Sequence, residues 1–261
     1  MLLTARKYSS VACWGGEVEK STLDLVIPVL NEQDLLSENV KKIVNFIDCH
    51  IGKNFKCNVY IVDNGSTDLT PKIAKNLESD LYGKVYYRRV DKRGVGLALK
   101  SIWSESKADY IGYMDLDLAT DLKYLPVALN ALAYQGADMV YASRLHERSK
   151  VAGRSVKREL VSRVFNSLLR LYLNVKFSDG MCGFKFLKRE CISDIMKNGA
   201  MSDGWFFCTE ILVVSEWMGL KLYELPVSWT DAPNSKVKVI PLALEYVKAM
   251  KNLKSYRVLI K

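Results

Sequence analysis

Apolar residues in the first half of the chain alternate between short, nearly continuous runs and longer stretches with helical spacing. The short runs are rich in β-branched residues and cover 23–30, 57–62, 84–90, 110–114 and 137–142. Between the first two runs, residues 33–49 place Leu35, Leu36, Val40, Ile43, Val44 and Ile47 at helical spacing. Strands buried on both faces of a sheet have this continuous apolar pattern. The alternation therefore predicts an α/β fold with a parallel sheet covered by helices on both faces.

The second half of the chain is less regular. Residues 156–174 predict a long helix, with Leu160, Val164, Leu168 and Leu171 on one face. A turn-rich stretch covers 177–185, an apolar helix that carries Glu210 covers 205–218, and a strand-like run covers 222–229. Because no internal repeat or low-complexity linker interrupts the pattern, we predict one domain.

The two ends differ from the rest. Residues 1–22 show no period and predict a loose N-terminal leader without the apolar core of a signal peptide. No window is apolar enough to predict a transmembrane helix. Residues 241–261 predict an amphipathic basic helix, which either packs on the domain or lies on anionic lipid. Its apolar face carries Leu242, Tyr246, Met250, Leu253 and Ile260, and its opposite face carries Lys248, Lys251 and Lys254.

Composition narrows the possible partners and compartment. The chain has 261 residues, of which 49% are hydrophobic, and this is enough for one large α/β core. Six scattered cysteines without a CxxC pair argue against a zinc site or a disulfide framework and favour a reduced, cytoplasmic compartment. A net charge of +9 favours anionic partners such as phosphorylated small molecules or an acidic membrane surface. Because no nucleic-acid-binding module is recognisable, we expect no nucleic acid partner.

Polar residues follow three of the predicted strands at the point where each strand ends. Asn31 and Glu32 follow the first, Asp63 ends the second, and Asp115 and Asp117 follow the fourth. Ligands of such sheets bind at the carboxyl ends of the strands. Carboxylates suit hard divalent cations, and such a cation can hold a diphosphate. The pattern predicts one nucleotide-type site, although a helix cap at the acid pair or an Asx-turn at Asp63 would also fit.

Three motifs in this half resemble glycosyltransferase family 2. They are VIPVLNE at 26–32, VDNGSTD at 62–68 and the DXD-like DLD at 115–117, and they occur in the family's order. The resemblance implies a GT-A fold, which is a Rossmann-like, mostly parallel sheet flanked by helices. It also implies a nucleotide-diphosphate sugar donor and a Mg²⁺ or Mn²⁺ ion.

Motifs in the second half resemble the polyprenyl-phosphate sugar transferases, most closely the dolichyl-phosphate β-glucosyltransferases. They are SRLH at 143–146, RSVKR at 154–158, CGFKF at 182–186 and VSW at 227–229, followed by Ser235 and Lys236. Together the matches predict a GT-A domain over 23–240. Two positions depart from the family pattern, which often has acids where this chain has Asn64 and Cys208.

The resemblance also implies roles for individual residues. Asp115 and Asp117 would hold the metal, Asp63 would bind the uracil ring, and Asn31 and Glu32 would lie beside the ribose. The arginines would bind the acceptor phosphate, and Asp117, Arg144 and Glu210 would be the catalytic residues. The expected donor-binding residues are Pro28, Asn31, Glu32, Asp63, Arg93, Asp115, Ser235 and Lys236, and the expected acceptor-phosphate residues are Arg144, Arg154 and Arg158.

These observations favour an inverting, metal-dependent transferase that moves a hexose, most simply glucose, from UDP to a polyprenyl phosphate at the cytoplasmic face of a membrane. A phosphate acceptor is already ionised and needs no general base, whereas a hydroxyl of a surface glycan would need one, for which Glu210 or Asp203 are candidates. A GDP-mannose-using mannosyltransferase and a catalytically silent nucleotide-sugar-binding module are further alternatives. A dehydrogenase is disfavoured, because no GxGxxG motif follows the first strand.

Overall fold

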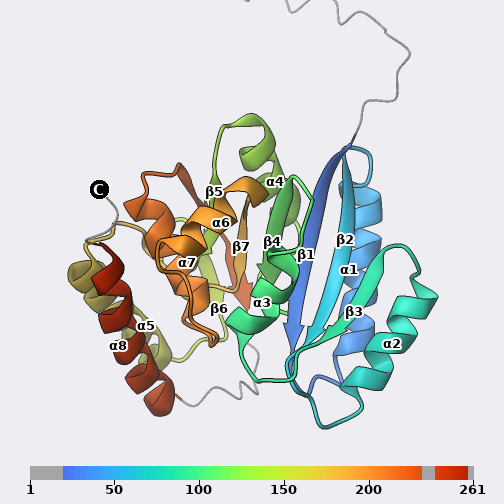
Figure 1. The fold of residues 1–261 in the computed structure, drawn as a ribbon, viewed down its shortest axis with the longest axis horizontal. Helices are drawn as coiled ribbons and strands as arrows, with labels where there is room; N and C mark the ends of the chain where they lie inside the picture. The colour runs from blue at the N-terminus through green and yellow to red at the C-terminus, as the bar shows by residue number, and fades with distance from the viewer. Residues whose placement is uncertain (1–19, 231–238, 258–261) are drawn as a thin grey trace, which may run out of the picture.

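The computed structural model describes residues 20–230 and 239–257. A seven-stranded sheet has the order β3-β2-β1-β4-β7-β5-β8, and a small second sheet pairs β6 with β9. The strands are β1 (Ser21–Val29), β2 (Phe55–Asp63), β3 (Val85–Arg89), β4 (Tyr110–Met114), β5 (Met139–Ser143), β6 (Lys150–Ala152), β7 (Phe184–Lys188), β8 (Leu222–Pro226) and β9 (Ser228–Thr230). The helices are α1 (Leu36–His50), α2 (Thr70–Asp80), α3 (Val95–Trp103), α4 (Tyr124–Tyr134), α5 (Val156–Leu173), α6 (Arg189–Lys197), α7 (Phe207–Trp217) and α8 (Val239–Tyr256). Figure 1 shows α1 and α2 at one side of the molecule and α5 and α8 at the other.

The predicted α/β fold is confirmed, including the mostly parallel sheet. β1 pairs in parallel with β2 and β4, β2 with β3, and β5 with β8. The exception is β7, which lies antiparallel between β4 and β5. Its sequence FKFLK follows a turn-rich stretch and contains two lysines, so its pattern does not predict a buried strand. Lys185 is nevertheless fully buried, because its ammonium donates to the carbonyl oxygens of Gly180 and Cys182 at 3.1 and 2.7 Å.

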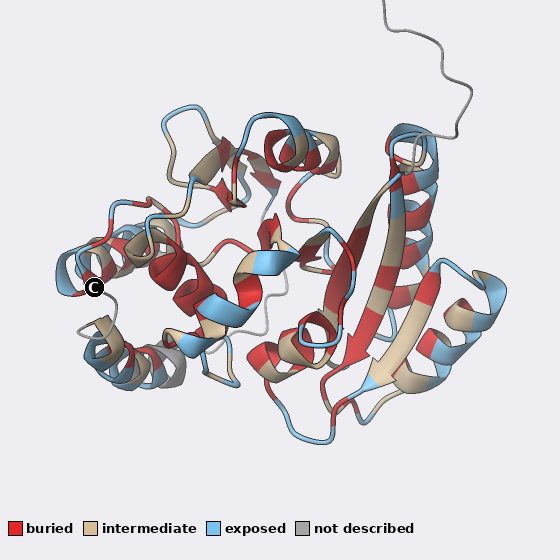
Figure 2. Cartoon of the chain, turned by 45° about the horizontal axis from the view of Figure 1, so that its top comes forward, coloured by how far each residue is buried: buried red, intermediate tan, exposed pale blue. Residues whose placement is uncertain are grey.

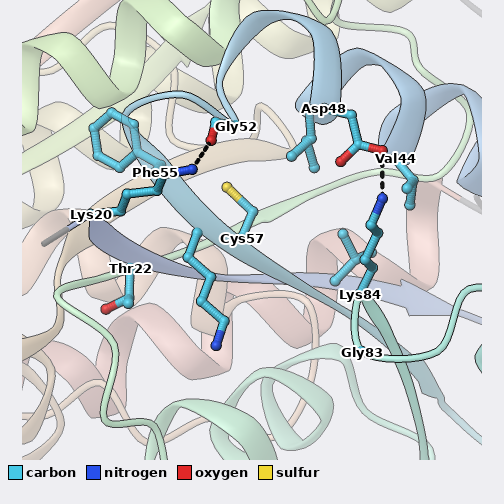
Figure 3. A pocket seen from close by; sticks show the side chains of 12 residues that line it. Lys20, Thr22, Val44, Asp48, Gly52, Phe55, Cys57, Gly83 and Lys84 are labelled. Carbon is cyan, nitrogen blue, oxygen red and sulfur yellow. Dashed lines mark hydrogen bonds and ion pairs between the residues drawn. The ribbon is translucent and has the colours of Figure 1, made fainter. Parts of the chain in front are cut away.

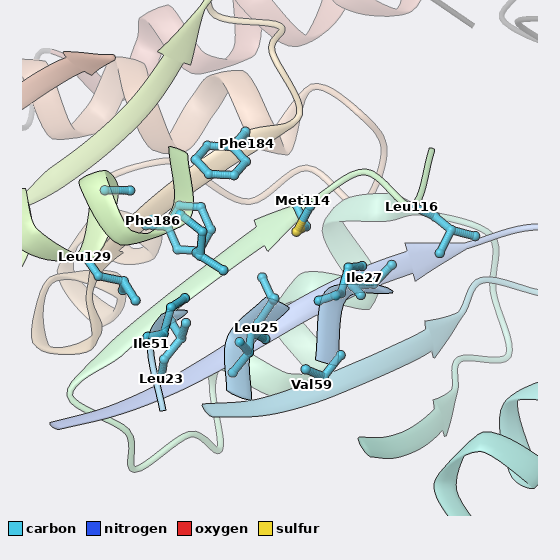
Figure 4. Close-up of a cluster of buried hydrophobic side chains, with 14 of the residues drawn as sticks. Leu23, Leu25, Ile27, Ile51, Val59, Met114, Leu116, Leu129, Phe184 and Phe186 are labelled. Carbon is cyan, nitrogen blue, oxygen red and sulfur yellow. The ribbon is translucent and has the colours of Figure 1, made fainter. Parts of the chain in front are cut away.

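Alternate residues of the central strands supply two cores, one on each face of the sheet. On one face, Leu23, Leu25 and Ile27 of β1 pack with the apolar residues of α1 and α4. Figure 4 shows these three side chains beside Phe184 and Phe186 of β7. On the other face, Val26 packs with α3 and α7. Figure 2 shows the buried strands between helices with exposed outer surfaces.

The first strand begins earlier than predicted. β1 starts at Ser21, so the last two residues of the predicted leader belong to the sheet. Ser21 and Thr22 pair with Phe55 and Lys56 of β2, and the Thr22 amide and hydroxyl also donate to Asp109 Oδ2, at 2.7 and 2.8 Å. Residues 1–19 of the predicted leader lie outside the described residues.

The C-terminal helix packs on the domain. Tyr246, Met250 and Leu253 are between 1% and 7% exposed and belong to the same core as α3 and α7. Tyr246 also contacts the rings of Phe165 on α5 and Phe206. The described part of the apolar face of α8 is therefore buried in protein, which contradicts the alternative that this face lies on lipid. Of the helices in the described ranges, none has the length and apolar character needed to cross a membrane.

Candidate functional site

The loops that follow β1 and β2 lie side by side and are joined by hydrogen bonds. The Asn31 amide donates to Ser66 Oγ at 2.9 Å, and Asn31 Oδ1 accepts from the Thr67 amide at 2.8 Å. Asn31 has a φ of 54°, a left-handed conformation that asparagine tolerates better than most residues. The Glu32 amide donates to Thr70 Oγ1 at 2.8 Å. These bonds bring the polar ends of the first two strands to one edge of the sheet, as predicted, and Pro28 lies one position before the end of β1.

Asp63 lies at the end of β2 with a fully buried side chain. One carboxylate oxygen accepts from the Ser66 amide at 2.8 Å, which is the Asx-type turn that the sequence allowed. The other accepts from Tyr87 Oη at 3.2 Å and from Arg89 Nη1 at 3.1 Å. Each carboxylate oxygen can accept two bonds, so Oδ1 retains acceptor capacity beyond these contacts. The Arg89 guanidinium, at the carboxyl end of β3, forms an ion pair with the Asp63 carboxylate.

Asp115 begins the loop after β4 and lies against the backbone of the neighbouring β7 segment. Its amide donates to the Gly183 carbonyl at 3.0 Å. A Cβ atom at Gly183 would lie 1.8 Å from Asp115 Oδ2, so only glycine leaves room for this carboxylate. Burial and the nearby Asp117 charge raise the pKa of Asp115 to about 7, while Lys185 and Arg144 oppose the increase. The site therefore holds two acids that repel each other.

The acid pair has the donor chemistry of a divalent cation site. Asp117 is exposed, and its Oδ1 accepts from the Ala119 amide at 3.0 Å. Leu118, which directly follows Asp117, has a φ of 55°. This left-handed backbone conformation turns the chain immediately after the acid pair. Throughout residues 20–230 and 239–257, no three His, Cys, Asp or Glu side chains form a metal-binding group. Two carboxylates with further oxygens from a phosphate are a common way to bind Mg²⁺, and a cation would relieve the repulsion that raises the Asp115 pKa.

A buried ion pair lies close to the acids. Arg144 Nε and Nη2 donate to Asp179 Oδ2 and Oδ1 at 2.7 and 3.0 Å, and the Arg144 guanidinium lies 5.0 Å from the centre of the Trp229 ring. Asp179 is fully buried, and the Arg144 charge lowers its pKa to about 2 despite the burial. Arg144 is thus held as a fixed positive charge near Asp115, and two of its donors are already bound.

The small sheet connects the acid loop to the other predicted arginines. Trp229 of β9 bridges to Thr120, and the Thr230 amide donates to the Ala119 carbonyl at 2.9 Å. β6 pairs with β9, and Arg154 follows two residues after β6. Arg154 lies 3.3 Å from Glu159, and Arg158 lies in the first turn of α5. The structure therefore brings the start of α5 to the side of the acid loop.

Glu210 is buried in α7 and is bonded to a loop. Its carboxylate oxygens accept from the amide and the hydroxyl of Ser202. Burial raises the pKa of Glu210, although the two Ser202 bonds oppose this effect. The neighbouring carbonyls of Asp203 and Gly204 accept from the amides of Leu97 and Gly96 at the start of α3. These contacts give Glu210 a clear structural role, which is to hold the loop that packs on α3.

The remaining predicted donor-binding residues are Arg93, Ser235 and Lys236. Arg93 is exposed and precedes Gly94, whose amide donates to Asn64 Oδ1 at 2.5 Å. Ser235 and Lys236 lie outside the described residues. Four further residues of this region were not predicted from the sequence, namely Arg89, Asp179, Gly183 and Lys185. Arg89 ends a strand at the same edge as Asp63, and that position was a usable signal. The contacts of Asp179 with Arg144 and of Gly183 with Asp115 depend on the position of β7, which the pattern did not predict.

A separate cavity of about 560 Å³ lies away from this edge. Its lining includes Thr22 and Phe55 at the beginnings of β1 and β2, Gly52 after α1, and Lys84. Figure 3 shows Lys20 bonded to the Gly52 carbonyl and Lys84 bonded to Asp48. Because the cavity lies at the amino ends of the strands, it is not part of the candidate site.

Comparisons with known proteins identify the family of this chain and its fold. The profile of "Glycosyl transferase family 2" matches residues 24–196. Glycosyltransferase AglD of Haloferax volcanii is 29% identical over 91% of this chain, and this chain spans only 37% of its length. Human dolichyl-phosphate beta-glucosyltransferase is 29% identical over 82% of this chain and 69% of its own. The yeast protein of the same name, from Saccharomyces cerevisiae, is 26% identical over 90% of this chain and 74% of its own.

Solved structures share the fold. Glucosyl-3-phosphoglycerate synthase from Mycobacterium tuberculosis, in complex with uridine-diphosphate, has a TM-score of 0.64 at 19% identity, covering 91% of this chain and 80% of that one. The complex of the same enzyme with Mn²⁺, uridine-diphosphate and glucosyl-3-phosphoglycerate has a TM-score of 0.65 at 18% identity, covering 90% of this chain and 80% of that one. At this identity the likeness shows the GT-A fold.

Proposed function

This chain belongs to glycosyl transferase family 2, and on that premise we propose that it transfers glucose from UDP-glucose to a polyprenyl phosphate with inversion at the anomeric carbon. The observation that carries the proposal is the joint position of Asp63, Asp115 and Asp117 at the carboxyl edge of one sheet. The names of the relatives support glucose and a lipid phosphate, and the uridine-diphosphate and Mn²⁺ complexes of the structural neighbour support the donor and the metal.

The donor would lie across the ends of β1, β2 and β4. Asp63 would accept from the uracil ring through the remaining capacity of its carboxylate, while Arg89 donates to the other oxygen of that carboxylate and helps to hold it in place. Asn31 and Glu32 would lie beside the ribose, with Pro28 and Arg93 at the margins of the donor site. Asp115 and Asp117 would hold Mg²⁺ or Mn²⁺, which neutralises the charge of a leaving diphosphate when it is bound.

A phosphate acceptor removes the need for a general base. The second pKa of a phosphomonoester is about 6, so the nucleophilic oxygen already carries charge at neutral pH. The remaining requirements are positioning and charge stabilisation. Arg144 supplies a fixed charge near the acids, because Asp179 and Trp229 hold its guanidinium. Arg154 and Arg158 would bind the acceptor phosphate, and Glu210 would serve mainly to hold the loop at Ser202.

A donor screen tests the proposal. Radiolabelled UDP-glucose, UDP-N-acetylglucosamine, UDP-galactose and GDP-mannose are each incubated with polyprenyl phosphate, with and without Mn²⁺. The expected result is a metal-dependent, acid-labile lipid product from UDP-glucose alone. Preferred use of GDP-mannose would overturn the donor assignment. A product without lipid would overturn the acceptor assignment and would favour transfer to a glycan hydroxyl, with Glu210 or Asp203 as the base.

A further inference from the structure

One face of α5 is apolar and open to solvent over about four helical turns. Val156, Leu160, Val164, Leu168 and Leu171 follow one another at spacings of three or four residues, and each is between 50% and 86% exposed. This spacing places them in a single stripe along the helix. The sequence pattern identified this face, and the structure shows that it does not pack on the domain. We call these five residues the α5 stripe.

The face of α5 opposite these five residues is occupied. Its buried side carries Ser162, Asn166, Leu169 and Leu173. The neighbouring helix is α8, and the Phe165 ring of α5 packs against the Tyr246 ring of α8. Lys254 of α8 lies 4.0 Å from the centre of the Tyr172 ring. The two helices form one side of the molecule in Figure 1. The α5 stripe therefore faces outward on a helix that is already anchored on its opposite side.

Charge beside the α5 stripe is almost entirely positive. α5 contains Lys157, Arg158, Arg163 and Arg170, but only one acid, Glu159. Glu159 is bound by Arg163 at 2.6 Å and by Arg154 at 3.3 Å, so its charge is matched within the protein. An apolar stripe edged by basic residues is the surface of an interfacial helix that inserts between anionic lipid headgroups. Two copies of this chain meeting through the same stripe would bring like charges together, which disfavours a symmetric dimer here.

The α5 stripe is also connected to the candidate site. Asn166, which is fully buried, accepts from the Gly180 amide at 2.9 Å and so joins α5 to the segment that carries Asp179 and Gly183. At the start of the helix, Arg158 lies two residues after Val156. A membrane that contacts the α5 stripe would therefore lie beside the arginines proposed to bind the acceptor phosphate.

We propose that the α5 stripe, and not the C-terminal helix, docks this chain on an anionic lipid bilayer. The inference rests on the proposed function only for its purpose, which is to bring a lipid-borne acceptor to the site. The docking itself stands on the exposed apolar residues and the charge that surrounds them.

Vesicle binding by the full chain tests the docking. A variant with Leu168→Gln and Leu171→Gln is compared with the wild type on phosphatidylcholine vesicles with and without phosphatidylglycerol. The matched control carries Leu69→Gln and Tyr82→Gln, two residues that are 59% and 90% exposed near α2, at the far side of the molecule. Each lost leucine should weaken partitioning roughly tenfold if it inserts fully. The control should bind as the wild type does, and binding of the wild type should require phosphatidylglycerol.

Equal binding by the wild type and the stripe variant would overturn the proposal. A wild-type dimer that the stripe variant separates, seen by size-exclusion chromatography with light scattering, would also overturn it and would assign the stripe to a second copy. Urea unfolding confirms that the stripe variant is folded. Transfer to a water-soluble, short-chain polyprenyl phosphate should be unchanged in the stripe variant, whereas transfer to a vesicle-borne acceptor should fall. If the wild type uses neither acceptor, the proposed function fails, and vesicle binding still decides the docking.

Discussion

Replacing Asp115 by asparagine should stabilise the metal-free protein while it removes metal binding. The pKa of Asp115 is raised from 3.8 to about 7 by burial and by the Asp117 charge. The folded state therefore binds a proton more tightly than the unfolded state, so the protein loses stability as pH rises from about 4 to about 7. At about 1.4 kcal/mol for each tenfold change in proton affinity, the increase in the Asp115 pKa from 3.8 to about 7 corresponds to roughly 4 kcal/mol. Since the side chain is partly exposed, relaxation and solvent screening reduce this to about 2–4 kcal/mol.

Urea unfolding in the presence of EDTA measures this difference. At pH 8, Asp115→Asn should be more stable than the wild type by about 2–4 kcal/mol, and the difference should shrink toward zero near pH 4. Asp80→Asn, at an exposed position at the end of α2, is the control and should change little at either pH. Added Mn²⁺ should stabilise the wild type but not Asp115→Asn. An Asp115→Asn variant that is no more stable than the wild type at pH 8, or a gain that is independent of pH, would refute the electrostatic reasoning.

Three further predictions follow from the same contacts. Asp179→Asn should destabilise the protein by about 3–5 kcal/mol, because it leaves the buried Arg144 charge without its carboxylate. In urea unfolding, the difference in stability between the wild type and Asp179→Asn should become smaller as pH falls from about 4 toward 2, where wild-type Asp179 itself takes up a proton. A difference in stability that does not change with pH would contradict the ion-pair account. Gly183→Ala should reduce Mn²⁺ affinity in calorimetry, because a Cβ at this position displaces the Asp115 carboxylate, whereas Gly83→Ala, at an open turn, should leave it unchanged. Mn²⁺ affinity of the wild type should fall about tenfold per pH unit below about 7, since the metal competes with the Asp115 proton, and an affinity that is constant between pH 5 and 8 would contradict the raised pKa.

The sequence was sufficient to predict the first five strands along the chain and the edge of the sheet that carries the site. Continuous apolar runs determine β1, β2 and β4, and the side chains that follow such strands must meet at one edge whatever the details of the loops. Asp63, Asp115 and Asp117 could be selected on this ground alone. The same rule, applied to β3, would also have selected Arg89.

Other parts depend on tertiary contacts that a linear pattern does not contain. β7 contains Lys185, whose burial is possible only because backbone carbonyls of residues 180 and 182 turn toward its ammonium. The partner of Arg144 is Asp179, which is 35 residues away in the sequence. The helical pattern correctly placed Leu160 and Leu168 on one face of α5. A periodic apolar face does not, however, reveal whether protein, solvent or lipid covers it.

The acceptor is the central claim, and one comparison tests it most directly. Radiolabelled UDP-glucose and Mn²⁺ are incubated with the protein and either polyprenyl phosphate or the corresponding polyprenol, and the lipid products are separated by thin-layer chromatography. The proposed mechanism uses the charge of the phosphate in place of a general base, so it predicts an acid-labile glucosyl lipid from polyprenyl phosphate and none from polyprenol. Equal transfer to both lipids, or no transfer to either, would contradict it.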